Sequence, residues 1–363
     1  MTRIKTMMFD YISKSPSIVR TYLRSELDEP SLQLVDALKS DRSIIVTGCG
    51  TSYHLAIAAA RYFRDVAKVN AHAIPSFDLA WYASDFVKDK ILFAISHSGA
   101  TKTTLDIVKQ VKGEATQVFS LSKDQGTKLA AASDVALVLP GGFEKAFPKT
   151  MTFTSGCIQL YRIALEVAKA KFGKADSLCA DEIADLMETA LHNNLEVVQE
   201  AVQAWKDYEI FNFVGGGPAW LSAMEVAIKM KENNYTASEG IEVEEITHGR
   251  TAAIQEGRPV VLIALNGPSV DRLCDVLESS KYVGAPTMVV QEEGVTLTST
   301  ADFTIRLPKC PNEIIAAIVA MLPLQVFSND FALANGYNPD AIRLDDPKWE
   351  YPHGKWIFPP GTH

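Results

Sequence analysis

Two short segments of the chain combine serine and threonine hydroxyls with glycine, and these residue types can bind a compact anion. In the first segment, Gly50, Thr51 and Ser52 follow a short apolar run; in the second, over residues 96–101, three hydroxyl side chains follow another apolar run. Hydroxyls beside backbone N–H groups at a helix N-terminus suit a phosphate for which neutral donors replace Lys or Arg. The two segments together predict a phosphate-binding site.

The same residues also fit other structures. Serine and threonine are preferred N-caps of helices, and for any single one of them the cap is the better explanation; two adjacent loops of this composition favour the anion site. A dinucleotide site is disfavoured. Gly48 and Gly50 fit the first glycines of that fingerprint, but Tyr53 occupies the third position and Val69-Asn70 stands where an acidic residue is expected.

A carboxylate and an imidazole lie near each other in the second half of the chain. Glu232 and His248 are 16 residues apart. In one site they would form an acid–base pair that moves protons on a sugar. The alternative is a helix surface of solvated glutamates and a histidine bonded to its neighbours, and the residues alone favour that alternative.

The chain repeats itself, and the repeat positions these residues. Gly48 and Gly215 each end an apolar run and lie 167 residues apart, while the segments that begin with Asp134 and Asp302 match at an offset of 168. A third landmark, residues 91–95, returns between them as residues 260–265. Three landmarks in one order at nearly one offset indicate a duplicated domain. The second copy has few loop hydroxyls, so we expect the first copy to bind the anion and the second to supply the Glu and His.

Each copy alternates apolar strands with helices, which implies a parallel sheet covered on both faces. The predicted strands are residues 43–46, 91–95, 117–121 and 135–139 in the first copy, and 210–214, 260–265, 286–290 and 303–307 in the second. One or two helices are expected over residues 7–38, and others over 53–63, 103–111, 150–172 and 180–205. The hydroxyl loops then lie at the carboxyl ends of strands, where doubly wound sheets bind ligands.

We expect four segments along the chain. A helical lead-in is predicted for residues 1–40, a first domain for 41–175, a second domain for 176–330, and for 331–363 a tail whose aromatic side chains dock on the protein.

Composition excludes several classes of protein. A net charge of −9 over 363 residues argues against a nucleic-acid surface. Five scattered cysteines without a Cys-x-x-Cys pair suit free thiols in a reducing compartment. The N-terminus lacks the apolar core of a signal peptide, and we expect no stretch to approach the ~20 apolar residues of a membrane span. We expect a cytoplasmic protein without nucleic-acid or membrane partners.

These residues resemble the sugar isomerase (SIS) family, in particular the isomerase half of glucosamine-6-phosphate synthase and its stand-alone relatives. The family's Cys-Gly-Thr-Ser stands here at residues 49–52, and its Ile-Ser-Gln-Ser-Gly-Glu-Thr at 95–101, with His97 and Ala100 as departures. Its Leu-Lys-Glu-Ile-Ser-Tyr resembles residues 230–235. Its Gly-Glu-Leu-Lys-His-Gly-Pro resembles residues 244–250, with arginine in place of proline. The spacing of Glu and His equals the family's and is the most specific match.

The resemblance implies a fold and a set of roles. The fold is α/β, with two tandem doubly wound, flavodoxin-like parallel-sheet SIS domains and helices on both faces. Glu232 would shuttle a proton between C1 and C2, and His248 would help open the sugar ring from a neighbouring subunit, which implies a homodimer. Lys348 is the best counterpart of a C-terminal lysine that closes the site. Lys149 replaces a small hydroxyl residue and would meet an acidic group on the substrate or point into water. The sugar phosphate would be held by Gly50, Thr51, Ser52, Ser96, His97, Ser98 and Thr101.

The resemblance also narrows the reaction. We expect a deglycase or deaminase that acts on a 6-phosphorylated amino sugar or Amadori compound, without a metal or redox cofactor. Residue 2 is Thr where a glutaminase would have a cysteine nucleophile, so glutamine is not the expected nitrogen donor unless a partner supplies ammonia. An aldose–ketose phosphosugar isomerase and a non-catalytic phosphosugar-binding regulator are the alternatives.

Overall fold

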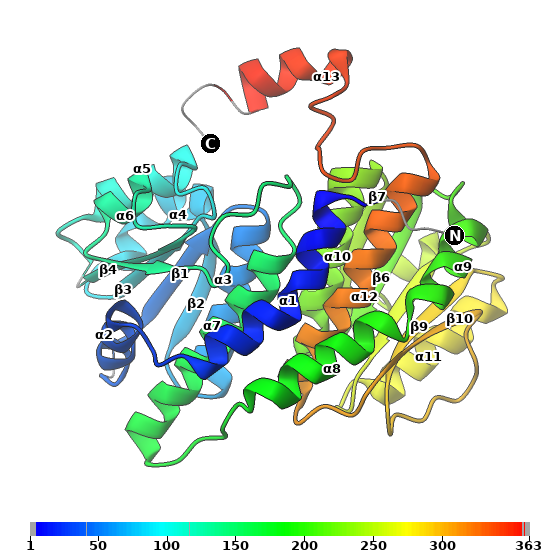
Figure 1. The fold of residues 1–363 in the computed structure, drawn as a ribbon, viewed down its shortest axis with the longest axis horizontal. Coiled ribbons are helices and arrows are strands. Elements are labelled where there is room, and N and C mark those ends of the chain that lie inside the picture. Colours follow the sequence, from blue (N-terminus) through cyan, green and yellow to red (C-terminus); the bar gives the residue numbers. More distant parts are fainter. Residues whose placement is uncertain (1–4, 41, 116, 358, 360–363) are drawn as a thin grey trace. The chain divides into compact units, whose positions relative to one another are not determined.

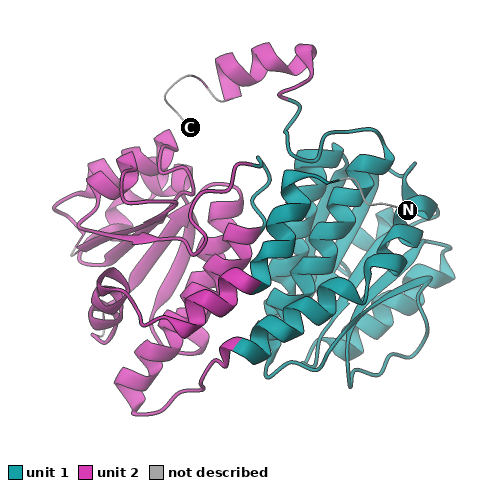
Figure 2. Ribbon diagram, viewed as in Figure 1, with its two compact units in different colours: residues 1–16, 146–150, 181–343 teal, residues 17–145, 151–180, 344–363 magenta. Residues whose placement is uncertain are grey.

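The computed structural model describes residues 5–40, 42–115, 117–357 and 359 (Figure 1). Its contacts divide the chain into two compact units (Figure 2). Unit 1 comprises residues 1–16, 146–150 and 181–343, and unit 2 comprises residues 17–145, 151–180 and 344–363. The short segment 146–150 therefore belongs with the second half of the chain, although it lies in the first half of the sequence.

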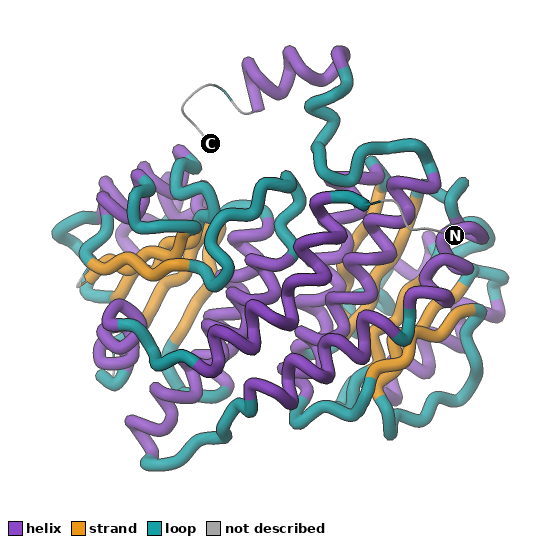
Figure 3. Tube along the Cα trace, viewed as in Figure 1, coloured by secondary structure: helices purple, strands orange, loops and turns teal. Residues whose placement is uncertain are grey.

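Unit 2 contains a parallel sheet of five strands in the order β2-β1-β3-β4-β5. All residues of the central strands β1 and β3 are buried, so helices must cover both faces of the sheet (Figure 3). The strands are β1 (Ile44–Gly48), β2 (Ala71–Pro75), β3 (Ile91–Ile95), β4 (Gln117–Ser122) and β5 (Val135–Val138). The helices that lie wholly in this unit are α2 (Glu29–Leu38), α3 (Thr51–Asp65), α4 (Ser76–Tyr82), η1 (Ser84–Val87), α5 (Lys102–Val111), α6 (Lys128–Ala132), α7 (Met151–Phe172), α13 (Pro347–Pro352) and η3 (His353–Ile357).

Unit 1 repeats this topology, since its strand order β10-β9-β8-β6-β7 is the same order read from the other edge. Its strands are β6 (Ile210–Gly215), β7 (Ala237–Glu242), β8 (Val260–Ala264), β9 (Thr287–Glu292) and β10 (Phe303–Leu307). Its helices are α9 (Leu195–Trp205), α10 (Pro218–Asn234), η2 (Arg250–Ala253), α11 (Val270–Tyr282) and α12 (Glu313–Ala334), together with nearly all of α8 (Ala180–His192); the residues of α1 (Met7–Arg24) fall in both units. The duplication and the doubly wound parallel sheets are confirmed.

The predicted elements are confirmed within a few residues, with two strands missed. Strands β2 and β7 are the edge strands next to β1 and β6, and their sequences, AHAIP and ASEGIE, lack the apolar content of the predicted edge strands β5 and β10. The alternative of a helix surface of solvated glutamates is wrong for the glutamates just before His248, because Ala237–Glu242 is a strand followed by turns. The helix predicted for 180–205 is interrupted at Asn193-Asn194 and forms two helices.

One helix contradicts the expectation that no segment is long and apolar enough to span a membrane. Helix α12 is 22 residues long and apolar enough to cross a membrane by length and composition, so the statement that no stretch approaches a membrane span is wrong for it. In the structure 94% of that apolar window is buried. Phe327 and Phe331 pack against Phe211 of β6 with ring centroids 6.2 and 5.3 Å away. The burial is that of the core helix of unit 1.

Candidate functional site

The first hydroxyl loop turns sharply from β1 into α3 because two glycines allow it. Gly50 has φ 56° and ψ −130°, and its counterpart in the repeat, Gly217, has φ 56° and ψ −129°. A side chain at Gly48 would place its Cβ 2.6 Å from the carbonyl oxygen of Ser52. The repeat therefore preserves the backbone of this turn, while only the first copy follows it with Thr51 and Ser52.

The second hydroxyl loop, after β3, is held by its own side chains. The Oγ of Ser96 lies 3.0 Å from Oγ1 of Thr101 and accepts a hydrogen bond from the N–H of Gly99 at 3.2 Å. The Oγ of Ser98 accepts the N–H of Ala100 at 3.2 Å. Thr101 stands at the N-cap of α5 but its side chain makes no capping bond. The cap interpretation therefore fails for Thr101, and the hydroxyls form a cluster instead.

Replacing Gly99 with alanine should destabilise the second loop. Gly99 has φ +62°, and an added Cβ would lie 2.2 Å from the Cβ of Thr127, whose hydroxyl caps α6. Backbone strain and overpacking together predict a loss of more than about 2 kcal/mol in the free energy of unfolding, measured by urea denaturation. Gly113→Ala is the matched control, because Gly113 has φ +98° but open space around it. Equal losses in the two variants would contradict this account of Gly99.

His97 lies beside the second loop and is held by the segment that precedes α7. Its Nε2 accepts the N–H of Glu144 at 3.4 Å, and its ring stacks on Phe143 at 6.2 Å between centroids. The Glu144 carboxylate is fully buried and accepts the N–H of Thr152 at 3.0 Å. Because Nε2 is an acceptor here, the described imidazole is the neutral Nδ1–H tautomer. Phe143 and Glu144 belong to no motif and were not predicted as site residues.

Glu232 lies in the last turn of α10 and pairs with a buried lysine. Lys229 is fully buried, and its Nζ lies 3.0 Å from Oε1 of Glu225 and 2.8 Å from Oε2 of Glu232. The side chain of Glu232 is 13% exposed and that of Glu225 is 1% exposed. Spacings of four and three residues put the three groups on one face of the helix. Lys229 and Glu225 were not predicted as site residues, although their Glu-to-Lys spacing of four indicates an ion pair on one face of a helix.

Burial and pairing set the charges of this ion triad, defined as Glu225, Lys229 and Glu232. Burial raises the pKa of Glu232 above its ordinary value, and the attraction of Lys229 offsets this only in part. For Lys229, burial alone would lower the pKa, but the two carboxylates reverse the direction and raise it. The lysine therefore stays charged. A carboxyl group whose pKa moves toward neutrality suits proton transfer at physiological pH.

Lys149 belongs to the same unit and acts on Glu232 electrostatically. Its positive charge lowers the pKa of Glu232, although less than Lys229 does. The segment that carries it is anchored: the N–H of Phe147 donates to Asp340 O at 2.9 Å, and Thr150 O accepts Gln325 Nε2 of α12 at 3.5 Å. The ammonium of Lys149 donates to the carbonyl of Ala146 and is half-buried. Lys149 is thus placed near a carboxylate of the protein and is not a fully solvated side chain.

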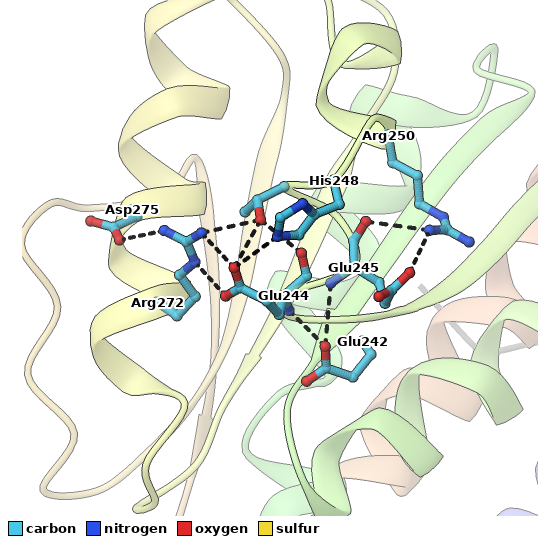
Figure 4. Close-up of polar contacts among 8 residues, drawn as sticks. Glu242, Glu244, Glu245, His248, Arg250, Arg272 and Asp275 are labelled. Carbon is cyan, nitrogen blue, oxygen red and sulfur yellow. Dashed lines mark hydrogen bonds and ion pairs between the residues drawn. The ribbon is translucent and has the colours of Figure 1, made fainter.

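His248 lies in the turns after β7, with its side chain 69% exposed. Its Nε2 is 3.2 Å from Oε1 of Glu244 (Figure 4). No hydrogen bond or ion pair joins His248 to Glu232 in the part of the chain that the structure describes. Arg250, two residues further along the chain, pairs with Glu239 at 2.9 Å and Glu245 at 3.3 Å.

Lys348 lies in the first turn of α13 with an exposed side chain, and its N–H donates to Asp346 at 2.9 Å.

Among the described residues no group of three or more His, Cys, Asp and Glu is arranged to hold a metal ion. Two arrangements therefore carry chemistry: a hydroxyl cluster suited to an anion in unit 2, and a buried carboxylate–lysine pair suited to proton transfer in unit 1.

Curated relatives match nearly the whole chain but are longer than it. The chain is 29% identical over 339 residues to the glutamine–fructose-6-phosphate aminotransferase (isomerizing) of Pyrococcus horikoshii. The matched region covers 93% of this chain and 56% of that protein. The chain spans a little over half the length of such relatives.

Solved structures share the fold. The C-terminal domain of glucosamine-fructose-6-phosphate aminotransferase from Francisella tularensis matches with a TM-score of 0.83 at 24% identity, covering 93% of this chain and 98% of that one. Glucosamine-6-phosphate deaminase from Thermotoga maritima matches with a TM-score of 0.76 at 21% identity, covering 92% and 97%. The family model of the SIS domain matches residues 37–164 and again residues 210–335. The chain therefore belongs to the SIS domain family and carries two SIS domains in tandem.

Proposed function

We propose that this protein is a phosphosugar enzyme that releases an amine or ammonia from a 6-phosphorylated amino sugar or Amadori compound. The observation that carries the proposal is Glu232, a nearly buried carboxylate paired with the fully buried Lys229 at 2.8 Å. A protein that only senses a phosphosugar needs no carboxyl group whose pKa is shifted toward neutrality. Relatives named as a deaminase and an isomerizing aminotransferase support the same chemistry.

In the proposed reaction, Glu232 takes the proton from C1 of the open-chain ketosamine and returns it to C2, while the carbonyl oxygen at C2 gains a proton and the nitrogen on C1 loses one. The bond between C1 and the nitrogen thereby becomes an imine, which water hydrolyses to sugar phosphate and free amine. His248, contributed by the second subunit of a homodimer, would transfer the proton that opens the ring. Lys348 would close the site from the tail. The protein would act in the cytoplasm.

The phosphate would be bound by the hydroxyl cluster of unit 2. Ser96, Ser98 and Thr101 present three hydroxyls within one short loop, and Thr51 and Ser52 begin α3 at the neighbouring strand. Gly50 lets the backbone approach, and His97 would contact the sugar as a neutral donor through Nδ1. Fixing a non-reacting phosphate restricts the position of C1 and C2 and so lowers the entropic part of the barrier.

Lys149 would select substrates whose amine part carries a carboxylate, such as the Amadori product of an amino acid. Lys149→Met should lower kcat/KM for such a substrate by roughly 10- to 100-fold, the loss expected for a charged hydrogen bond. The matched control is a substrate made from an uncharged amine of similar size, for which the loss should be smaller, because only the effect of Lys149 on the pKa of Glu232 remains. Equal losses with both substrates would contradict a role in reading the carboxylate.

The proposed function is tested by supplying candidate substrates and identifying products. We expect fructosamine 6-phosphates to yield sugar phosphate and free amine, detected by chromatography and an amine assay. Ammonia from glucosamine 6-phosphate would indicate the deaminase form of the proposal. Interconversion of fructose 6-phosphate and an aldose phosphate alone would favour the isomerase, and tight binding without any turnover would favour the regulator.

A further inference from the structure

The imidazole of His248 is held by a carboxylate that an arginine holds in turn (Figure 4). Arg272 donates from Nε to Oε2 of Glu244 at 2.8 Å and from Nη2 to Oε1 at 2.9 Å. The Nε2 of His248 lies 3.2 Å from that same Oε1. Two parallel N–H···O bonds from one guanidinium fix both the position and the plane of a carboxylate. The imidazole therefore meets an oriented acceptor, although its side chain is exposed.

The protonation of the pair follows from Arg272. The hydrogen bond from Arg272 is the main reason that the pKa of Glu244 lies below its ordinary value, so Glu244 is a carboxylate at neutral pH. A carboxylate only accepts hydrogen bonds. The nitrogen that faces it must carry the proton, so Nε2 of His248 is an N–H, and Nδ1 of the neutral ring is the basic nitrogen.

The contact of Arg272 with Glu244, called the clamp from here on, is anchored to the fold at both residues. Arg272 lies in the first turn of α11, whose Leu273 and Leu277 are fully buried in the core of unit 1. The backbone N–H of Glu244 donates to Oε2 of Glu242 at 2.7 Å, at the end of β7. Nη2 of Arg272 also donates to Oγ1 of Thr247 at 3.1 Å, in the residue before the histidine. The loop thus has a helix anchor and a strand anchor.

Other charged groups nearby are engaged elsewhere in the described residues. Asp275 accepts Nη1 of Arg272 at 3.1 Å, on the other side of the guanidinium from the histidine. Arg250 pairs with Glu239 and Glu245 (Figure 4 shows the second of these). The described partner of the imidazole is Glu244 alone. Glycine stands at this position in the family segment that residues 244–250 resemble, so the carboxylate distinguishes this chain.

We propose that Glu244, clamped by Arg272, is a positioning residue that holds His248 as the Nε2–H tautomer and leaves Nδ1 to exchange the proton with the substrate. The inference rests on the ring-opening role proposed for His248. In that step Nδ1 takes the proton of the anomeric hydroxyl as the bond between the anomeric carbon and the ring oxygen breaks. The carbonyl forms, and Nδ1 returns the proton to the ring oxygen, so protons and bonds balance.

The test compares a substrate that must open its ring with one that cannot close it. Glu244→Gln and Arg272→Met should each lower kcat for a fructosamine 6-phosphate by roughly 10- to 100-fold through misplacement of the imidazole. The 5-deoxy analogue has no hydroxyl with which to form the ring, and turnover of this analogue should not change. Asp275→Asn neutralises the other carboxylate that pairs with Arg272, and this variant should behave as the wild type with both substrates.

Each outcome has one meaning. Equal losses with the cyclic and the 5-deoxy substrate, or none with either, would overturn the inference while leaving the proposed function in place. A wild-type protein that turns over neither of these substrates would instead refute the deglycase form of the proposed function. The tautomer is then still measured directly, by long-range ¹H–¹⁵N spectra of ¹⁵N-histidine protein, with His248 assigned from His248→Asn. A protonated Nε2 at neutral pH supports the clamp, and a protonated Nδ1 overturns it.

Discussion

Replacing Glu232 with glutamine should lower kcat by about 10²- to 10⁴-fold, the range that a positioned general base contributes. Glutamine preserves the shape of the side chain and its hydrogen-bonding capacity but cannot take up the substrate proton. Phosphosugar binding should remain nearly intact, because the hydroxyl loops of unit 2 are unchanged. Steady-state kinetics and calorimetric titration with the substrate measure the two effects separately.

The fold of this variant should be retained. Lys229 keeps Glu225 as an ionic partner at 3.0 Å after Glu232 has lost its charge. The informative comparison is Glu225→Gln, which removes one carboxylate from the same lysine but not the proposed base. We expect Glu225→Gln to lower kcat by less than about tenfold, the size of an indirect electrostatic effect. Similar losses in the two variants would indicate that the triad, and not Glu232 as a base, accounts for the effect.

The rate should also depend on pH in a defined direction. The base must be unprotonated, so kcat/KM falls as the pH drops through the pKa of Glu232. Burial raises that pKa, so the acid limb of the profile should lie above the usual carboxyl range. Exchange of solvent deuterium into C1 and C2, followed by NMR, should follow the same limb in the wild type and vanish in Glu232→Gln.

Replacing Lys229 with methionine should cause the largest loss of stability of any single change discussed for unit 1. The variant leaves two nearly buried carboxylates without their shared cation, and breaking a buried ion pair from one side costs roughly 3–5 kcal/mol. Lys231→Met is the matched control, since Lys231 is exposed on the same helix. The control should change the free energy of unfolding by about 0.5 kcal/mol or less. Chemical denaturation of both variants measures the difference.

The stability of Lys229→Met should depend on pH more strongly than that of the wild type. Without the lysine, whose attraction partly offsets burial, the pKa of Glu232 rises further above its value in the unfolded chain. Between these two pKa values the folded variant binds more protons than the unfolded chain, so its free energy of unfolding falls as the pH rises. The deficit should be smallest in acid, where the carboxyl groups are neutral. The double variant with Glu225→Gln should recover part of the loss; no recovery would mean that uncompensated charge is not its cause.

The sequence carried the architecture because the relevant signals are local. Apolar runs mark the central strands β1, β3 and β8, since a strand buried on both faces needs no distant information to be recognised. The edge strands β2 and β7 were missed for the converse reason: what makes them strands is pairing with β1 and β6, and their half-exposed residues show little of it.

The features of the candidate site likewise fall into those that the local sequence predicted and those that depend on packing. Residue types and spacing selected the two hydroxyl loops and the pair Glu232 and His248, because a motif is a property of neighbouring residues. Nothing local indicated that Lys229 is fully buried, or that segment 146–150 packs in unit 1 and brings Lys149 near Glu232.

The sequence by itself determined which groups are available for chemistry and the tandem α/β fold that carries them. The tertiary structure decided their electrostatic state. A pKa depends on burial and on charges brought close from elsewhere in the chain, and only packing sets these for Glu232. The contact of Arg272 with Glu244 likewise joins α11 to a loop 28 residues earlier, so the orientation of His248 is a product of the fold.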